Sequence, residues 1–508
     1  MIALVNKDLF RYEIHALLKA FFPREEVKVR LEGEPLKGNR AQALQEAALD
    51  PFLYVRYEEN EAVMEVRTET DAYRRVCRND LLPEAWRVPE GLPMNEKSPE
   101  LRSMVKHVLY DLLKEVTGRE LPWGELIGIR PTKIARDLIA AGEAPSAAAA
   151  YMEETYSVSG EKAVLASEIA EREHRLLSQL HGRDGYSIYI GIPFCPTTCL
   201  YCSFPSFALH AWKEETDRYL DALDAEMQAA VRLPYLQGKY LDTVYIGGGT
   251  PTTLEAPQLA RLFGMIRKYF PMETCLEFTV EAGRADSITA EKLRVIREAG
   301  VTRISINPQT MRDETLRLIG RRHTSAQVEE AFAMAREEGF DNINMDIILG
   351  LPGEDSSDVR YTTERIRQLG PDSLTVHTLA IKRGSRLQKW IEENGYESLK
   401  DTEAGMEAAA QAAAQMGMLP YYLYRQKNMT GNLENTGYAV PGKFGIYNIL
   451  IMEEVQSILA LGAGSISKVL HGGGRIERAD NCKDVRTYLE TLPEMIRRKE
   501  VLFRADEA

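Results

Sequence analysis

The sequence is poor in cysteine and has no uninterrupted apolar run of membrane-spanning length. Six cysteines among 508 residues are too few for a disulfide framework, which indicates a reducing compartment. The best apolar candidate, residues 449–470, contains Glu453, Glu454 and two glycines, so we expect no transmembrane helix. Lys7 and Asp8 precede any long apolar stretch, so we expect no signal peptide and a cytoplasmic location.

Basic charge is also scarce. The net charge of −13 disfavours generic nucleic-acid binding, because contacts with phosphates need a basic face. The sequence has no internal repeat, and its eight histidines form no metal-binding array. Its 44% hydrophobic and 27% charged residues are typical of a soluble globular protein. We therefore expect neither a membrane partner nor a nucleic-acid partner.

Half of the cysteines lie in one short segment that follows the apolar stretch 186–194. Cys195, Cys199 and Cys202 fall within eight residues, so one tight loop can surround one metal centre. Soft sulfur ligands select zinc, Cu(I) or iron–sulfur clusters. A structural zinc site needs four protein ligands, and the nearest fourth candidate is His210. An iron–sulfur cube on three cysteines instead leaves one iron open for chemistry.

A structural zinc site and three buried thiols remain the alternatives for this segment. The other cysteines are isolated and are expected to be small buried apolar residues: Cys77, Cys275 and Cys482.

The central part of the chain alternates short apolar runs with segments long enough for helices. Such alternation predicts parallel strands joined by right-handed crossovers. The predicted fold class is α/β, with a partial (β/α)6 TIM-like barrel over residues 181–400. An N-terminal α+β module is predicted over residues 1–180 and a C-terminal α+β domain over residues 401–508. The six predicted barrel strands are Ser187–Ile192, Thr243–Ile246, Leu276–Glu281, Arg303–Asn307, Asn344–Leu349 and Leu374–Ile381.

The N-terminal module shows both periodicities. Apolar residues recur at helical spacing from Phe10 to Phe21 and again from Leu101 to Val116. A hairpin is predicted from residues 52–57 and 62–68. The segment 121–133 is rich in glycine and proline, and we favour a packed linker over an anion-binding loop.

Polar residues follow several of the predicted strands. Gly247–Gly249 close the second strand, Glu281 ends the third, Gln309 follows the fourth and Asp346 lies in the fifth. Function in barrels of this kind lies at the carboxyl ends of the strands, where the cysteine loop also begins. Each residue could be a satisfied core group or a turn. Together they predict a polar cavity at one edge of the barrel.

The motif Tyr189-Ile-Gly-Ile-Pro-Phe-Cys195-x-x-x-Cys199-Leu-Tyr201-Cys202 resembles the radical S-adenosylmethionine (SAM) superfamily. Within it, the sequence resembles the oxygen-independent coproporphyrinogen III oxidase (HemN) branch and its HemZ-type subgroup. The subgroup resemblance includes Leu121-Pro-Trp-Gly, Gly128-Ile-Arg-Pro-Thr-Lys and Pro420-Tyr-Tyr-Leu-Tyr-Arg-Gln-Lys-Asn428. It therefore extends over essentially the whole chain and implies a radical SAM barrel core.

The resemblance also implies site residues. The ligands of a 4Fe–4S cluster would be Cys195, Cys199 and Cys202. The positions matching those that bind the SAM on the cluster are Tyr189, Gly248, Glu281 and Ile466. A second SAM would be held by the residues matching Tyr201, Gly249, Thr250, Gln309, Arg321, Asp346 and Ala380.

The implied reaction is the oxidative decarboxylation of two coproporphyrinogen III propionates to vinyls, giving protoporphyrinogen IX in haem biosynthesis. A 5′-deoxyadenosyl radical made from SAM would take a hydrogen from each propionate, and CO₂ and one electron would then leave. The resemblance also implies a flavodoxin- or ferredoxin-type electron donor. The substrate carboxylates need cationic partners, for which Lys382, Arg383 and Arg386 are the candidates.

Two departures bear on the function: the first keeps other functions open, and the second argues against haem ligation. Phe204 stands where the oxidases have a further cysteine, which bears on the decarboxylation and on the second SAM. The related haem-transfer chaperones (HemW type) also have an aromatic residue there. Their His-Asn-x-x-Tyr-Trp motif appears here as Tyr447-Asn-Ile-Leu-Ile-Met452, without the histidine and the tryptophan. A radical SAM methyltransferase that opens haem is the other alternative, and the acidic charge disfavours a tRNA-directed role.

Overall fold

A computed structural model describes residues 1–23, 25–34, 52–81, 87, 96–127, 130–202, 206–381, 385–395, 402–425 and 433–504. The chain forms two compact units. The N-terminal unit comprises residues 1–167 and 425–433, and the barrel unit comprises residues 168–424 and 434–508. No helix in the described ranges combines the length and the apolar character needed to cross a membrane.

The N-terminal unit is built on a five-stranded sheet with the strand order β2-β1-β3-β4-β5. β1 lies parallel to β2 and β3, whereas β3, β4 and β5 form an antiparallel meander. The strands are β1 (Ile2–Val5), β2 (Lys28–Leu31), β3 (Leu53–Tyr57), β4 (Ala62–Arg67) and β5 (Ala72–Cys77). The helices are α1 (Arg11–Phe21), α3 (Pro99–Thr117), α4 (Pro131–Ala140), α5 (Pro145–Tyr156) and the first part of α6 (Gly160–Leu177).

Local sequence signals explain these elements. The Ser98 side chain accepts the amide N–H of Leu101 at the start of α3, and Gly118 ends that helix with a φ of 64°. The apolar faces of α1 and α3 share one core with the sheet. The two helices and the hairpin predicted here are confirmed. In the linker segment Trp123 is fully buried, as expected for a segment that packs rather than binds an anion.

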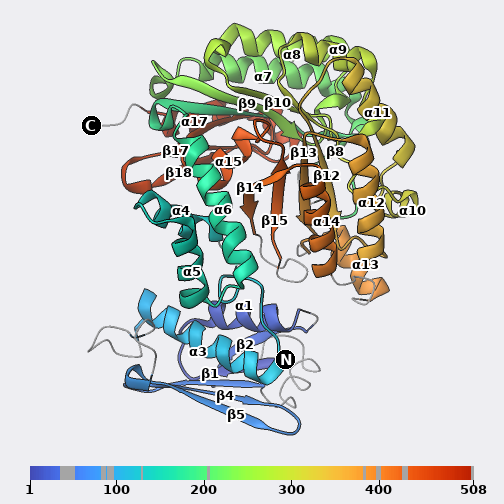
Figure 1. Ribbon diagram of the computed structural model, residues 1–508. Helices are drawn as coiled ribbons and strands as arrows, with labels where there is room; N and C mark the ends of the chain where they lie inside the picture. The colour runs from blue at the N-terminus through green and yellow to red at the C-terminus, as the bar shows by residue number, and fades with distance from the viewer. Residues whose placement is uncertain are drawn as a thin grey trace. The chain divides into compact units, whose positions relative to one another are not determined.

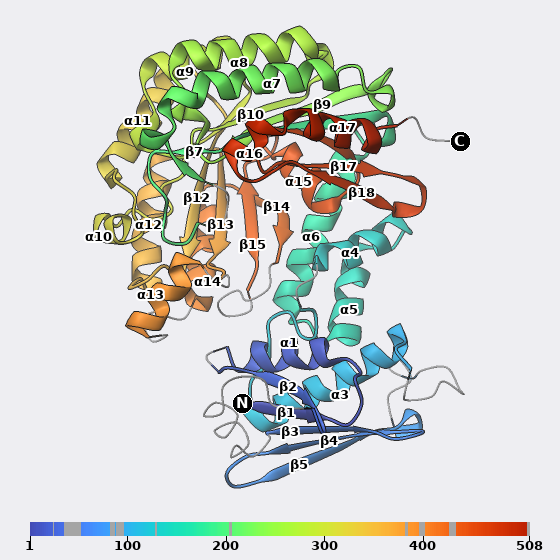
Figure 2. The ribbon, with the colours of Figure 1, turned by 180° about the vertical axis from the view of Figure 1, so that it is seen from behind.

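The barrel unit contains a sheet of eleven strands, and six parallel neighbours in chain order form its centre. This arrangement confirms the predicted partial (β/α)6 barrel. The six strands are β6 (Gly185–Ile192), β9 (Tyr240–Gly248), β10 (Glu277–Glu281), β11 (Arg303–Ser305), β12 (Ile343–Leu349) and β13 (Ser373–Thr378). They are parallel because each crossover carries a helix that covers the outer side of the sheet (Figures 1 and 2).

Those crossovers hold most helices of the barrel unit. They are α7 (Thr216–Ala230), α8 (Ala256–Tyr269), α9 (Ala290–Glu298), α10 (Asp313–Leu318), α11 (Ser325–Glu337) and α12 (Ser356–Leu369). After β13 come α13 (Arg386–Asn394) and α14 (Glu403–Gln415). The short strands β7 (Phe194–Cys195) and β8 (Phe207–Ala208) pair with each other beside the start of the barrel.

The last hundred residues extend the same sheet at both edges. β15 lies antiparallel to β13 and pairs with β14, while β16 lies parallel to β6 and continues into β17 and β18. The strands are β14 (Leu419–Tyr424), β15 (Asn435–Ala439), β16 (Ser457–Leu461), β17 (Ile466–Leu470) and β18 (Ile476–Asp480). The helices are α15 (Ile446–Glu453), α16 (Val485–Glu490) and α17 (Leu492–Leu502). Ladder hydrogen bonds therefore cross the predicted boundary at residue 400, and the three-domain division stays a prediction.

A buried charge network ties α17 to this sheet. The Glu226 carboxylate accepts Lys499 Nζ at 2.7 Å and Asn481 Nδ2 at 2.8 Å on one oxygen. Its other oxygen accepts the Gly462 amide at 2.8 Å and the Tyr488 hydroxyl at 2.7 Å. Both carboxylate oxygens thus have two donors each, and the network holds the turn between β16 and β17.

Candidate functional site at the cysteine loop

The cysteine loop begins at the carboxyl end of β6. Cys195 and Cys199 are buried and Cys202 is half-buried. The neighbouring strand β9 ends beside the start of the loop, because Ile192 is in register with Gly248. The loop therefore lies at the edge of the barrel where the sequence predicted the functional residues.

Side chains and backbone from distant segments fix the shape of the loop. The buried Arg284 donates to the Thr197 carbonyl at 3.3 Å and contacts Cys199 Sγ at 3.7 Å. The amide of Leu200 donates to the Ile319 carbonyl at 2.9 Å. Arg386, at the start of α13, donates to the Thr198 carbonyl at 2.9 Å. The loop is thus held by residues that follow β10, β11 and β13.

The surroundings of the sulfurs suit an iron–sulfur cluster. The Thr250 hydroxyl donates to Cys195 Sγ at 3.5 Å, and the Arg284 guanidinium lies beside Cys199 Sγ. Burial raises the pKa of the Cys195 thiol to about 11, and Thr250 opposes that rise. Cys199 and Cys202 are near enough to raise this pKa further. Because a metal binds the thiolate and not the thiol, metal binding must overcome the raised pKa of Cys195. The nearby donors help to stabilise the charge of the thiolate.

A single metal ion requires a different arrangement of ligands from a cluster. Among the residues that the structure describes, no three His, Cys, Asp or Glu side chains converge on a point that would hold one ion. Structural zinc needs four sulfur or nitrogen ligands around one centre. In a cube each cysteine binds a different iron, so the sulfurs lie farther apart. The buried loop, with donors from Thr250 and Arg284 beside its sulfurs, therefore suits a cluster that is held by thiolates.

The glycine segment after β9 packs directly on the cysteine loop. Gly248 has a φ of 109°, which favours glycine over other residues. A Cβ on Gly249 would lie 2.6 Å from the Phe194 carbonyl oxygen and 3.0 Å from Cys195 Sγ. Any larger residue at position 249 would therefore displace the Phe194 carbonyl or the Cys195 side chain.

Glu281 lies at the end of β10 within a group of tyrosines. The Tyr245 hydroxyl donates to Glu281 Oε1 at 2.5 Å. The Tyr245 ring stacks on Tyr447 with centroids 4.5 Å apart and on Tyr189 at 6.2 Å. Burial raises the pKa of Glu281 to about 7, and the nearby Asp346 charge adds to the rise. Glu281 is therefore a carboxyl group that titrates near neutral pH.

Gln309 and Arg321 carry buried polar atoms with no partner. Neither Gln309 Oε1 nor Arg321 Nε has a hydrogen bond among the described residues. The other Arg321 nitrogens donate to the Asn307 carbonyl at 2.6 Å and the Tyr201 hydroxyl at 3.2 Å. Gln309 also has a φ of 67°, a left-handed conformation that is uncommon for residues with a side chain. The unsatisfied atoms and the uncommon backbone conformation of Gln309 make this a candidate ligand-binding region.

Asp346 completes the polar edge from β12. Its carboxylate accepts Asn344 Nδ2 at 2.7 Å and lies 3.6 Å from His377 Nε2. Burial alone would raise the pKa of Asp346, but His377, Asn344 and Thr375 hold it below its usual value. Asp346 therefore stays ionised beside Glu281.

The structure brings most of the predicted residues to this edge. Ile466 begins β17, which runs antiparallel to β16 from the same edge, and its side chain is 43% exposed. Ala380 is half-buried just after β13. Three residues of the sequence-based hypotheses lie outside the described residues: Phe204, Lys382 and Arg383.

Three residues of this edge were not predicted from the sequence. Arg284 and Tyr245 contact predicted site residues, and Tyr447 was noted only for its lack of a histidine. Arg284 comes three residues after Glu281, just past a strand end, and that position was a usable signal. Nothing in the sequence shows that Tyr447, two hundred residues from Tyr245, stacks on it.

Comparisons with known proteins show what this chain is similar to. The profile of the Radical SAM superfamily matches residues 189–366. The oxygen-independent coproporphyrinogen-III oxidase-like protein HemZ of Bacillus subtilis is 40% identical over 402 residues, 78% of this chain and 80% of that protein. The heme chaperone HemW of B. subtilis is 38% identical over 39% of this chain and 51% of the chaperone. The solved structure of coproporphyrinogen III oxidase (HemN) from Escherichia coli matches 64% of this chain and 73% of that chain. Its TM-score is 0.49 and its identity 23%.

The match to HemZ extends over most of both chains, and the superfamily profile begins at Tyr189 and includes the cysteine loop. The cofactors of this class are a 4Fe–4S cluster and SAM, and the donors around Cys195 and Cys199 suit them. The chain therefore belongs to the HemZ family of oxygen-independent coproporphyrinogen-III oxidase-like proteins and is a radical SAM enzyme.

Proposed function

We propose that this enzyme decarboxylates coproporphyrinogen III oxidatively and converts two propionates to vinyl groups. The observation that carries the proposal is the polar edge beside the cysteine loop, where Gln309 Oε1 and Arg321 Nε are buried without partners. Buried polar atoms cost free energy unless a ligand satisfies them. A site that leaves two of them open next to a cluster-binding loop is suited to polar cofactors and a polar substrate.

In this proposal Cys195, Cys199 and Cys202 hold the cluster. When bound, the cluster and SAM supply a carbon-centred radical that removes a hydrogen atom from the substrate. Thr250 and Arg284 donate toward the sulfurs and stabilise their negative charge. The small Gly249 lets the glycine segment approach that loop closely.

The ionised Asp346 and the titratable Glu281 supply negative charge for the sulfonium and ammonium groups of SAM. Opposite charges attract strongly in a buried site because little water screens them. Tyr189, Gly248 and Ile466 would complete the first SAM site. A second SAM would meet the residues around Gln309, Arg321 and Asp346, together with Tyr201, Gly249, Thr250 and Ala380.

At the substrate, loss of a β-hydrogen atom, of CO₂ and of one electron turns each propionate into a vinyl. The carboxylates would need cations, for which the sequence offers Lys382, Arg383 and Arg386. Arg386 donates to the Thr198 carbonyl of the cysteine loop, so we keep Lys382 and Arg383 as the candidates. A tetrapyrrole is therefore the proposed substrate class. One redox partner would supply the electron that reduces the cluster, and another would accept the electron that the substrate loses.

Haem transfer is the second candidate, because the B. subtilis relative at 38% identity is named a heme chaperone. Tyr447 stands at the position of the chaperones' histidine. Its side chain is buried, and its ring stacks on Tyr245 at 4.5 Å. A stacked and buried phenol is badly placed to ligate haem iron, which disfavours this candidate.

The test is anaerobic reconstitution of the cluster, followed by incubation with SAM and coproporphyrinogen III. We expect protoporphyrinogen IX and deoxyadenosine. Deoxyadenosine without a porphyrin product would contradict the proposal. A haem titration with a stoichiometric Soret shift would favour the chaperone, and a methylated or linear tetrapyrrole would favour the ring-opening methyltransferase.

A further inference from the structure

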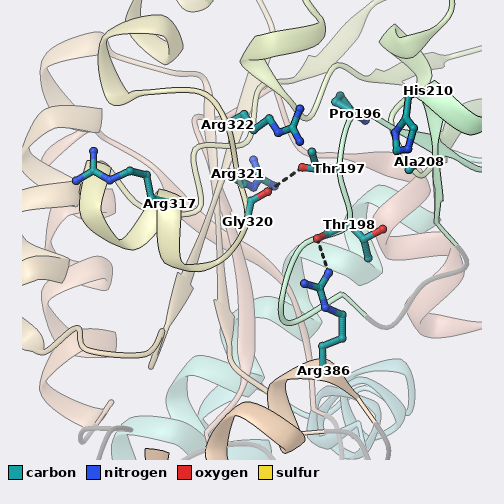
Figure 3. Close-up of a pocket in the computed structure, with 10 residues that line it drawn as sticks. All are labelled: Pro196, Thr197, Thr198, Ala208, His210, Arg317, Gly320, Arg321, Arg322 and Arg386. Carbon is teal, nitrogen blue, oxygen red and sulfur yellow. Dashed lines mark hydrogen bonds between the residues drawn. The ribbon is translucent and has the colours of Figure 1, made fainter.

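A groove of about 650 Å³ lies against the cysteine loop (Figure 3). We call it the arginine groove and define it by Thr197, Thr198, Gly320, Arg317, Arg322 and Arg386. Its loop residues are those between Cys195 and Cys199, whose sulfurs are buried while Thr197 and Thr198 are partly exposed. The groove therefore meets solvent on one side and the backbone between two cluster ligands on the other.

The groove is cationic on an acidic protein. Arg317, Arg322 and Arg386 are exposed, His210 lies at one end, and no Asp or Glu lines it in the described part of the chain. Within that same part, no carboxylate lies within ion-pair distance of Arg317 or Arg322. The whole chain carries a net charge of −13, so this patch opposes the overall charge. Uncompensated cations around a groove attract an acidic partner.

Hydrogen bonds connect the groove to the cysteine loop. Thr197 Oγ1 donates to the Gly320 carbonyl at 2.7 Å, and Arg386 donates to the Thr198 carbonyl at 2.9 Å (Figure 3). A partner bound in the groove would thus contact Thr197 and Thr198, the residues that lie between Cys195 and Cys199 in the chain. That position suits electron transfer into the cluster.

We propose that the arginine groove is the docking surface of a small acidic protein that delivers one electron to the cluster. The inference rests on the proposed function, which requires the cluster to be reduced before SAM is cleaved. The donor, a flavin or iron–sulfur protein, is oxidised by one electron and the cluster is reduced by one electron. No atom is transferred in this step.

The directions of the arginines favour a protein surface over a small anion. In Figure 3 the side chains of Arg317, Arg322 and Arg386 point in different directions and do not converge on one point. A phosphate or carboxylate site needs donors that meet at one place. Separated cations instead match several acidic groups on a larger partner, which gives steering and orientation.

The experiment measures the binding of a reduced flavodoxin, as the acidic probe, to the reconstituted enzyme by calorimetry at low and high ionic strength. The test variant is Arg317→Glu/Arg322→Glu. The matched control is Arg267→Glu, an exposed arginine in the last turn of α8, which runs from the carboxyl to the amino end of the barrel strands. We expect the test variant to raise the Kd for flavodoxin by about tenfold or more at low ionic strength, and the control to leave this Kd unchanged.

The rate of cluster reduction adds a second readout. Reduction by flavodoxin should slow in the test variant, whereas reduction by dithionite and the SAM cleavage that follows should not. Equal flavodoxin affinity in all three proteins would overturn the docking surface. Slower reduction by dithionite would also overturn it, because the arginines would then act on the cluster itself. Competition by inorganic phosphate at constant ionic strength would reveal a small-anion site and overturn it too.

Failure of the proposed function gives a different result. An enzyme that binds flavodoxin in the groove and cleaves SAM, but makes no porphyrin product, would keep the docking surface. The decarboxylation alone would then be lost. The two failures are therefore distinguishable.

Discussion

Two buried polar clusters in the barrel unit differ in how completely their hydrogen bonds are satisfied. At Glu226, four donors from α7's neighbours meet two carboxylate oxygens, and Lys499 compensates the charge. At the cysteine edge, Gln309 Oε1 and Arg321 Nε are equally buried but have no partner among the described residues. The first cluster is complete by itself, and the second leaves two polar atoms open to a ligand.

This difference distinguishes a buried network that stabilises the fold from buried polar atoms that are open to a ligand. A satisfied buried network fixes a fold, because removing any member leaves a costly unpaired group. An unsatisfied one destabilises the free protein and is relieved by binding. We therefore expect mutations at the Glu226 cluster to change stability, and mutations at the cysteine edge to change binding.

The largest effect is expected from Cys195→Ala, which tests the cysteine edge. Uptake of iron and sulfide should fall to background and SAM cleavage should be lost, because two thiolates cannot hold the cube. Iron and sulfide analysis after anaerobic reconstitution measures this. Cys275→Ala, at an isolated cysteine, is the control and should bind the cluster normally. Full cluster uptake by Cys195→Ala would remove the loop from the cluster site.

Next in size is Lys499→Met, which tests the satisfied cluster. Glu226 would keep its buried charge without its cation, so the free energy of unfolding should fall by about 3–5 kcal/mol. Chemical denaturation measures the change, and Glu226→Gln/Lys499→Met should recover much of it. Arg497→Met, in an exposed pair on the same helix, should leave stability unchanged. A loss no larger than that of the control would show that this network is not structural.

A smaller effect is expected from pH, through Glu281. Its pKa of about 7 means that the carboxyl is largely neutral at pH 6 and largely ionised at pH 8. Cationic SAM prefers the ionised form, so its affinity should rise about tenfold between these pH values. Glu281→Gln should remove this pH dependence, whereas the exposed Glu298→Gln should keep it. A flat profile in the unmodified enzyme would contradict a role of Glu281 in SAM binding.

The raised pKa of Glu281 makes stability depend on pH in the opposite direction from SAM affinity. The folded pKa of Glu281 is raised above the ordinary 4.5, so its contribution is fully present below pH 4.5. That contribution is lost as the pH rises through 7. Raising the pH therefore lowers the free energy of unfolding of the ligand-free protein, while it raises the affinity for SAM.

The smallest effect is expected from Gln309→Met, which makes the cysteine edge resemble the satisfied cluster. Removing an unpartnered buried oxygen should raise the stability of the ligand-free protein by about 1 kcal/mol. The added stabilisation by SAM should shrink at the same time. Thermal melts with and without SAM measure both, with the exposed Gln411→Met as the control. Lower stability without SAM would mean that Gln309 is a core residue.

Much of the fold followed from local patterns. The six barrel strands are short runs of buried apolar residues, and α1 and α3 carry their apolar residues at helical spacing, so both could be predicted. β5, with mostly exposed residues, was not predicted because its pairing with β4 creates it. The C-terminal domain was predicted as α+β, but the positions of the strands β14–β18 were not, because they depend on the two free edges of the barrel sheet at β13 and β6.

The sequence by itself determined the cysteine loop, because three cysteines within eight residues lie close together wherever the chain runs. It also determined the order of the barrel strands, since consecutive βα units pair with their neighbours. Only the tertiary structure decided that Arg284 reaches Cys199, that Tyr447 stacks on Tyr245 and that Lys499 compensates Glu226. Those contacts join residues far apart in the chain, and local periodicity carries no information about which buried charge or ring will meet which.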